Sequence, residues 1–293
     1  MELYRVFYHV ASEKSFSRAA EKLFVTQPAV SQAISQLEGK LEQRLIIRHS
    51  KGISLTEAGE ILFTHIEPAF HIIRSGEVQL DALKDLRKGS ITISASDTIC
   101  MYYLPEILGI FKGKYPEINI RIANKTTSET IEALRRGKAD IGIINIPEKM
   151  DGRIRIWKKT ELSECFAAGE AYHALAGKKL SPEEVADLPL MLLEKGTSTR
   201  MFIDKFFNEL GIRIQPEIEL GSVDLLLKFA AIGMGVSCVT REYLQKSEFR
   251  EKLFILESEM EFPKRYLGVI TIRNVPLTKA ARAFLDIILE EER

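Results

Sequence analysis

The first 56 or so residues place apolar side chains mainly at helical spacing. Leu3, Phe7 and Val10 share one face of a first helix, and residues 16–23 predict a second. A third helix is expected from about Thr26, because a threonine hydroxyl group suits the N-cap position. The pattern indicates that this part of the chain is mainly helical.

A hairpin and a long helix are predicted after the three short helices. Basic and β-branched residues around a glycine, at residues 48–55, predict the hairpin. Residues 56–87 then predict one helix whose apolar positions alternate by four and three residues. These positions are Leu62, Ile66, Ala69, Ile73, Gly76, Leu80 and Leu83. The seam favours pairing with a second helix, burial on the protein's own core being the alternative, and Pro68 removes one internal hydrogen bond.

From residue 89 onward, short β-rich runs alternate with helical patterns. Strands are expected at residues 91–94, 118–123, 140–146, 165–167, 190–193, 217–220, 236–239 and 267–272. Helices are expected from the first strand to about residue 112 and at residues 128–136, 199–210, 223–231 and 278–290. This alternation predicts an α/β fold with mostly parallel sheets.

A helix, a tight turn and a second helix are predicted within residues 16–34. Ala20 is small where two helices must cross closely, and Leu23 and Val25 are expected to anchor the turn. Pro28 suits the first turn of the second helix, where its missing N–H group has no partner to lose. The segment is therefore typical of a helix-turn-helix.

The second of these helices has two opposed faces. On a helical wheel the core-facing stripe consists of Val30, Ile34, Leu37 and Leu41. The outward face is polar and uncharged, and it consists of Pro28, Ser31, Gln32 and Ser35, with Gln27 at the exposed N-terminal end. Such side chains can enter a DNA major groove and hydrogen-bond base edges, and glutamine pairs well with adenine. The alternative is a small helical bundle with a solvated polar face.

The N-terminal segment resembles the winged helix-turn-helix of the LysR family of transcriptional regulators. The resemblance is carried by the run AAEKLFVTQPAVSQAISQLE, followed by LEQRLIIRHSKGISLTEAGE. The order of wing, long linker helix and βα domain also matches, so the resemblance covers essentially the whole chain. It implies a sequence-specific DNA-binding regulator whose activity responds to a small-molecule effector.

The resemblance also implies a domain organisation. A winged helix-turn-helix is expected at residues 1–58, a linker and dimerisation helix at 59–88, and an effector-binding domain at 89–293. The last is expected to be an α/β domain of the two-lobed, periplasmic-binding-protein-like (type 2) fold. Lobe I would comprise residues 89–161 and 266–293, and lobe II residues 162–265.

The same resemblance implies residues that contact DNA. Those expected to approach the major groove are Thr26, Gln27, Pro28, Ser31, Gln32 and Ser35. Arg48, with help from His49, is expected to reach phosphate or the minor groove from the wing. Many members carry arginine where this chain has Gln32, so adenine contact is expected here in place of guanine reading. Ile46 and Ile47, where Leu-Phe is common, are a conservative core change.

Four residues are implied to line the effector cleft: Ser96, Thr98, Thr127 and Thr197. Each lies in a hydroxyl-rich stretch between a strand and a helix, so ordinary helix capping is the alternative. Several hydroxyl and free N–H groups together suit a small anion or a carboxylate. Asp97 opposes this expectation, because a nearby carboxylate repels an anion.

The three cysteines lie far apart and form no CxxC pair, so no structural disulfide is expected. Cys100 lies just inside a predicted helix, whose N-terminus can lower a thiol pKa. A redox-responsive regulator that uses Cys100 is therefore an alternative reading. Cys165 and Cys238 lie in apolar strand patterns and are expected in the core.

Charge gives only weak support for DNA binding, because the formal net charge is zero. Through Glu57 there are eight basic residues and six acidic ones, a slight positive excess. A single copy should bind DNA weakly, since backbone affinity scales with the phosphates neutralised. A dimer through the long helix would strengthen binding by effective concentration, and the resemblance favours a tetramer.

The sequence lacks the signals of several other classes of protein. No run of ~18 apolar residues predicts a membrane helix, and the start of the chain shows no export signal, which favours the cytoplasm. The missing export signal and the N-terminal helices disfavour a plain solute-binding protein. No HExxH, GxSxG, P-loop or GxGxxG motif occurs, so we expect no metal, no cofactor and no enzyme activity.

Overall fold

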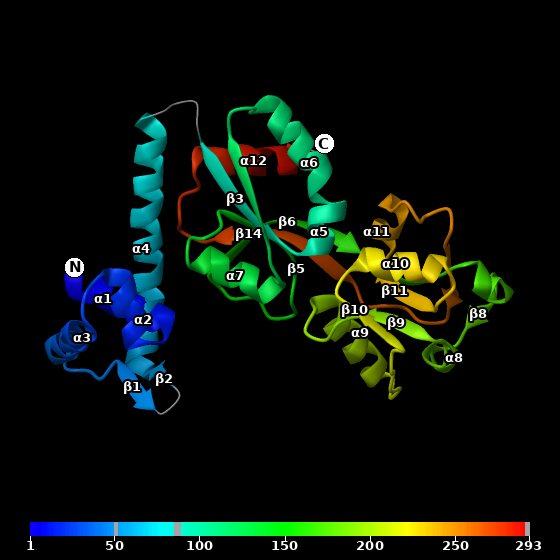
Figure 1. The fold of residues 1–293 in the computed structure, drawn as a ribbon, viewed down its shortest axis with the longest axis horizontal. Coiled ribbons are helices and arrows are strands. Elements are labelled where there is room, and N and C mark those ends of the chain that lie inside the picture. Colours follow the sequence, from blue (N-terminus) through cyan, green and yellow to red (C-terminus); the bar gives the residue numbers. More distant parts are fainter. Residues whose placement is uncertain (50–51, 85–88, 291–293) are drawn as a thin grey trace. The chain divides into compact units, whose positions relative to one another are not determined.

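Three short helices open the N-terminal unit in the computed structural model, which describes residues 1–49, 52–84 and 89–290. They are α1 (Glu2–Glu13), α2 (Phe16–Leu23) and α3 (Gln27–Leu41). An antiparallel hairpin of β1 (Ile46–His49) and β2 (Gly52–Leu55) follows, and then the long helix α4 (Glu57–Lys84) (Figure 1). Residues 1–80 and 274–276 form this unit, and the rest of the chain forms a second one, the C-terminal unit.

The core of the N-terminal unit follows the predicted helical periodicity. Val30, Ile34 and Leu37 of α3 are buried, as are Ala19 and Ala20 where the helices meet. Hydroxyl caps set the helix starts, because Ser15 accepts from a backbone N–H group of α2 and Thr26 from one of α3.

One prediction for the turn between α2 and α3 is wrong. Val25 was expected to anchor the turn, but 47% of its surface is exposed. Leu23, at the end of α2, is half-buried and packs against the core of the unit. The turn is closed by backbone hydrogen bonds to the last turn of α2, so it does not require a buried side chain after Leu23.

Helix α4 buries only part of its predicted seam. Ile66 packs into the core of the N-terminal unit and Leu62 is half-buried, whereas Ala69, Ile73 and Gly76 are exposed. The start of the helix is also held by Tyr8 of α1, whose ring stacks on those of two phenylalanines, Phe63 and Phe70. The side chains of Leu80 and Leu83 and the predicted helix end near residue 87 lie outside the described residues.

The C-terminal unit contains a first five-stranded sheet with the strand order β4-β3-β5-β14-β6. Its strands are β3 (Ser90–Ala95), β4 (Asn119–Asn124), β5 (Ile141–Asn145), β6 (Ile154–Leu162) and β14 (Arg265–Ile272). Its helices are α5 (Asp97–Tyr102), α6 (Leu104–Lys114), α7 (Thr127–Arg135) and α12 (Lys279–Glu290). Helices α6 and α12 cover one face and α7 covers the other (Figure 1). These elements are lobe I below.

A second five-stranded sheet has the order β10-β9-β11-β7-β12. Its strands are β7 (Glu164–Ala168), β9 (Leu190–Leu193), β10 (Ile218–Leu220), β11 (Val236–Thr240) and β12 (Phe254–Ile255). The accompanying elements are the 3-10 helix Glu170–Leu175, α8 (Pro182–Ala186), α9 (Ser198–Glu209), α10 (Val223–Ala231), α11 (Arg241–Lys246) and the small pair β8 (Lys179–Leu180) and β13 (Glu257–Ser258). These elements are lobe II.

The sheets are mixed, whereas mostly parallel sheets were predicted. In lobe I, β3 runs parallel to β4 and β5, but β14 is antiparallel to β5 and β6. In lobe II, β7 is antiparallel to β11 and β12. The reason is that the chain enters β7 and β14 from the other lobe, so no helical crossover precedes them to bring them in parallel.

Two elements of lobe I differ from the predicted pattern. The single helix expected up to about residue 112 is divided at Tyr103, and Pro105 occupies the first turn of α6, where its missing N–H group costs nothing. Strand β6 was not predicted, because Arg155, Lys158 and Lys159 interrupt its apolar positions. It forms an edge of the sheet, where charged side chains are tolerated.

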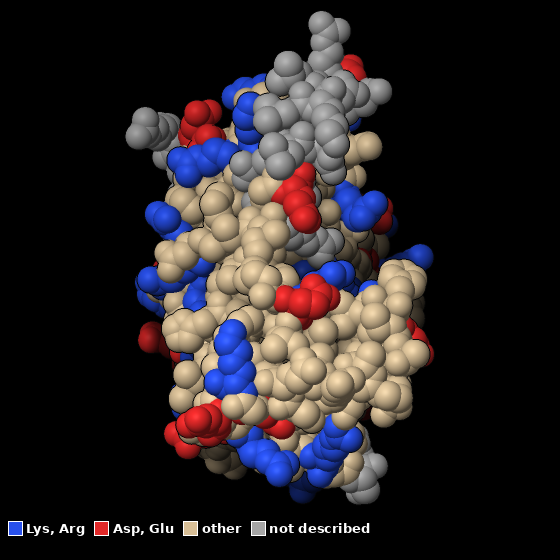
Figure 2. All heavy atoms as spheres, turned by 90° about the vertical axis from the view of Figure 1, so that its left-hand side faces the viewer, with Lys and Arg blue, Asp and Glu red and all other residues tan. Residues whose placement is uncertain are grey.

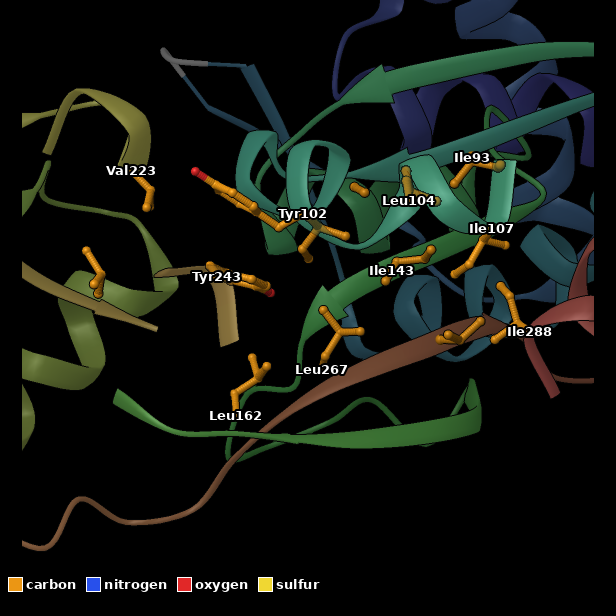
Figure 3. Packing of buried hydrophobic residues seen from close by; sticks show 14 of the residues in the cluster. Ile93, Tyr102, Leu104, Ile107, Ile143, Leu162, Val223, Tyr243, Leu267 and Ile288 are labelled. Carbon is orange, nitrogen blue, oxygen red and sulfur yellow. The ribbon is translucent and has the colours of Figure 1, made fainter. Parts of the chain in front are cut away.

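One apolar core extends through both lobes. Figure 3 shows Ile93, Ile107 and Ile143 packed together within lobe I. The ring of Tyr102, at the end of α5, stacks on that of Tyr243 in α11, with centroids 5.4 Å apart. The Tyr102 hydroxyl group also donates to the Asp224 carboxylate at the start of α10, so the lobes meet through both apolar and polar contacts.

Candidate DNA interface and effector site

The outward face of α3 is accessible to solvent. Gln27, Gln32 and Ser35 are exposed, as are Thr26 and Pro28. The predicted polar side chains therefore lie opposite the buried stripe of the same helix, although the Thr26 hydroxyl group is occupied as a cap. Figure 2, which faces the N-terminal unit, shows broad uncharged areas between individual Lys, Arg, Asp and Glu side chains. This surface suits recognition of base edges better than bulk attraction to phosphate.

The wing contacts α3 directly. Arg48 on β1 donates from Nη2 to the Ser31 hydroxyl oxygen, at 2.7 Å, and its guanidinium group lies 4.2 Å from the centroid of the Phe16 ring. Ser31 is half-buried by this arrangement, while the neighbouring His49 is exposed. A guanidinium group has five N–H donors, so the bond to Ser31 uses only one of those of Arg48.

Backbone contacts fix the hairpin against α3 and α4. The Glu38 carboxylate, in the last turn of α3, accepts from the backbone N–H groups of Leu45 at 2.8 Å and Ile46 at 3.2 Å. Gly59 allows α4 to pass close by, because a Cβ atom there would lie only 2.1 Å from the Leu45 carbonyl oxygen. Neither Glu38 nor Gly59 was predicted from the sequence, although both hold the wing in place.

The predicted effector residues lie at strand-to-helix junctions of the two lobes. Ser96 precedes α5 without making a side-chain capping bond, and Thr98 lies in the first turn of that helix. Thr127 opens α7, and all of these side chains are half-buried. Thr197 differs, because its hydroxyl group donates to the Glu194 carbonyl oxygen and accepts from the backbone of α9, as the capping alternative describes.

Asn145 is a further polar residue where lobe I meets lobe II, and it was not predicted from the sequence. It ends β5 of lobe I and donates from Nδ2 to the Ser198 hydroxyl oxygen at the start of α9 in lobe II, at 3.1 Å. Its Oδ1 atom is buried and has no hydrogen-bond partner among the described residues. The available signal was a single amide at the carboxyl end of an apolar strand.

A buried ion pair lies where the chain crosses between the lobes. Arg265, the first residue of β14, donates to the carboxylate of Glu164, the first residue of β7. Arg265 also donates to the Thr199 hydroxyl group at 3.3 Å, while Thr240 donates to Glu164 at 3.4 Å. The guanidinium group of Arg265 lies 4.8 Å from the ring centroid of Phe202. The pair thus connects the crossing strands with helix α9.

The environment of Cys100 opposes the redox alternative. Burial, with the nearby Asp97 carboxylate, raises the pKa of this thiol, whereas the redox alternative depends on a pKa lowered by the helix N-terminus. A raised pKa disfavours the thiolate, which is the reactive form. Cys165 and Cys238 are buried as predicted, and burial raises the pKa of Cys165 to about 12.

Comparison with known proteins identifies the class. Residues 84–293 match the LysR substrate binding domain, and residues 1–60 match the bacterial regulatory helix-turn-helix protein of the lysR family. The chain belongs to the LysR family and is a transcriptional regulator with a DNA-binding domain and an effector-binding domain. Relatives of the chain are named as transcriptional regulators or activators, and its own function as a regulator follows from the two family domains.

Individual relatives match over nearly their whole length. The HTH-type transcriptional regulator CysL of Bacillus subtilis (strain 168) is 30% identical, covering 98% of this chain and 96% of CysL. The HTH-type transcriptional activator CmpR of Synechocystis is 28% identical, covering 99% and 94%. Among solved structures, a full-length OxyR variant from Pseudomonas aeruginosa has a TM-score of 0.66 at 21% identity, covering 99% of this chain and 95% of that one. CbnR has a TM-score of 0.56 at 19% identity, covering 98% and 99%.

The part of the chain that the structure describes shows neither a metal site nor a membrane-spanning helix. Within residues 1–49, 52–84 and 89–290, no three His, Cys, Asp or Glu side chains are grouped so as to hold a metal ion. No helix among the described residues is long and apolar enough to span a membrane.

Proposed function

We propose that this regulator reads DNA sequence with the outward face of α3 and with the wing. Gln27, Ser31 and Gln32 would contact base edges, with Thr26, Pro28 and Ser35 beside them. Arg48 and His49 would contact phosphate or the minor groove. The observation that carries the proposal is the Arg48–Ser31 hydrogen bond, which joins the wing to α3 as one surface.

We further propose that a small anionic effector binds between the lobes. Ser96 just before α5, Thr98 in its first turn, Thr127 at the start of α7 and Thr197 just before α9 would line its site. Asn145 joins them because its buried Oδ1 atom has no partner among the described residues and would accept from an N–H or O–H group of the effector. The Asp97 carboxylate accepts a hydrogen bond from Asn124 at 3.1 Å, which weakens its repulsion of an anion. The effector would act by preferring one arrangement of the lobes.

The proposed active form is a dimer through α4 that assembles further into a tetramer. The exposed apolar residues of α4 support the dimer, because Ile61, Ile72 and Ile73 are unusual on a solvated helix. The C-terminal unit also exposes large apolar side chains, among them Ile122 and Ile232, which would suit further contacts between copies. A regulator of this kind would act in the cytoplasm with its DNA.

The DNA proposal is tested with the full-length protein and the DNA directly upstream of its own coding sequence, together with a duplex selected by the protein from a randomised pool. We expect tight binding that resists unrelated competitor DNA at fixed salt. The triple variant Gln27→Ala, Ser31→Ala, Gln32→Ala should lose this binding, with each lost base contact costing ~1–3 kcal/mol.

Gln43→Ala provides a matched control, since Gln43 is exposed just beyond α3 and outside the proposed face. It should bind like the unmodified protein. If the triple variant binds the selected duplex as tightly as this control does, the outward face of α3 is only a solvated surface and the proposal is wrong.

A further inference from the structure

Among the described residues of the N-terminal unit, Phe24 is the most exposed large apolar one. In the turn between α2 and α3, 95% of its surface is accessible. Val25 beside it is also exposed, and the exposed stretch continues through Thr26 and Gln27 to Ala29. An exposed aromatic ring contributes no free energy of burial to the folded state. The packing of the N-terminal unit therefore does not explain why a phenylalanine occupies this position.

The backbone at Phe24 is also unfavourable for its residue type. Its φ and ψ angles of 54° and 41° lie in the left-handed region. The conformation is held by hydrogen bonds from the N–H groups of Phe24 and Val25 to the carbonyl groups of Ala20 and Glu21. Glycine or asparagine is usual at such a helix end, because a bulky side chain crowds the backbone there. Phenylalanine is thus unexpected here for two reasons, the left-handed backbone and the exposed ring. Residues that break such rules occur mainly at functional or strained sites.

The place of Phe24 in the chain indicates which partner would cover the ring. The exposed stretch leads directly into the N-terminal end of α3, where Gln27 and Pro28 are proposed to approach the major groove. The exposed residues from Phe24 to Ala29 are all uncharged. Among the base edges of the major groove, the thymine methyl group is the apolar one, and phenylalanine is a side chain that contacts it.

We propose that Phe24 is a specificity residue that packs its ring against a thymine methyl group beside the bases read by α3. The inference rests on the proposed DNA interface and extends it from polar to apolar readout. The ring would be covered only in the complex, which accounts for its exposure in the free protein.

The test compares full-length Phe24→Asn with the unmodified protein on the duplex selected from the randomised pool. Asparagine suits the left-handed conformation, so amide exchange in α2 and α3 should slow, on the order of fivefold. DNA binding should nevertheless weaken roughly tenfold. Replacing each thymine in turn by deoxyuridine removes the methyl group alone. This replacement should weaken DNA binding by the unmodified protein at one thymine for each bound copy of the N-terminal unit. Binding by Phe24→Asn should not change at that thymine.

Glu42→Asn is the matched control, because Glu42 holds the same left-handed position at the end of α3, with φ of 53°. It should show slower exchange without weaker binding. Phe24→Leu, which keeps an apolar side chain, should retain most of the affinity. If Phe24→Asn binds normally while the Gln27, Ser31, Gln32 triple variant does not, the inference is wrong and the interface stands. If neither variant binds more weakly, the proposed interface fails as well.

Two further outcomes would overturn the inference. Weaker binding by Phe24→Asn without any dependence on thymine methyl groups would exclude the thymine contact. Normal DNA affinity combined with lost transcriptional output would show that Phe24 contacts another protein.

Discussion

Helix α3 and the region between lobes I and II hold their polar side chains in different ways. On α3, Gln27, Gln32 and Ser35 project from a helix whose other face is buried, and their side chains are exposed in the free protein. Between the lobes, Asn145 of lobe I is already hydrogen-bonded to Ser198 of lobe II, and Thr197 is hydrogen-bonded within lobe II. The proposed DNA-reading side chains are thus accessible before DNA binds, whereas an effector at the proposed site would have to replace or extend existing hydrogen bonds.

The largest effect is expected where the inter-lobe contacts are most deeply buried. Arg265→Met leaves the Glu164 carboxylate without its cation, and breaking a buried pair in this way costs about 3–5 kcal/mol. The unfolding free energy of the C-terminal unit should fall by that amount. Fluorescence of Trp157, the only tryptophan of the chain, reports on this unit alone.

The double variant Glu164→Gln, Arg265→Met separates loss of the pair from loss of packing. It should recover much of the lost stability, because no buried charge remains. Amide exchange in helices α1–α3 should stay unchanged in both variants. A single variant that unfolds within about 1 kcal/mol of the unmodified protein would show that water reaches Glu164 and that the pair is not a rigid connection.

A smaller effect is expected on the DNA-facing side. Arg48→Ala removes a proposed phosphate contact together with the bond to Ser31, so DNA affinity should fall roughly tenfold. The slope of log K against log salt concentration should become shallower by about 0.9, the value for one phosphate contact. Arg48→Lys keeps the charge but not the planar group over Phe16, and should preserve the slope while still weakening binding. Binding titrations across salt concentrations measure both, and an unchanged slope in Arg48→Ala would place Arg48 away from phosphate.

The sequence was most informative where one helix carries the whole pattern. The spacing of Val30, Ile34 and Leu37 identified the buried stripe of α3, and the structure confirms it. The opposite face followed from the same period, although its DNA contacts remain a prediction. Val25 was misassigned because a turn closed by backbone hydrogen bonds leaves no mark in the side-chain pattern.

The region between the lobes was less predictable because its residues are distant in the chain. Glu164 and Arg265 meet only through the order of the strands, and each looks like an ordinary surface charge in the sequence. Asn145 follows an apolar strand with no motif of its own. The redox alternative for Cys100 rested on its helix position alone, whereas burial and the Asp97 carboxylate, which only the packing reveals, raise the pKa of the thiol.

The smallest predicted effect concerns the acid sensitivity of lobe I. Burial alone would raise the pKa of Asp151, but hydrogen bonds from the side chain and backbone of Arg153 and from Arg135 hold it well below its ordinary value. Because the folded pKa is depressed, the stabilisation is present above the ordinary value near 4 and is lost as pH falls toward the folded value.

Asp151→Asn should therefore lower the unfolding free energy of the C-terminal unit by about 1 kcal/mol at pH 7 and flatten its decline between about pH 5 and pH 2. Trp157 lies on β6, just after this cluster, so its fluorescence follows the relevant transition. Asp187→Asn, at an exposed carboxylate after α8, should leave the acid profile unchanged. Equal acid profiles for Asp151→Asn and the unmodified protein would mean that the loop carrying Asp151 is already open before the C-terminal unit unfolds, and that its arginine contacts add nothing to the stability of lobe I.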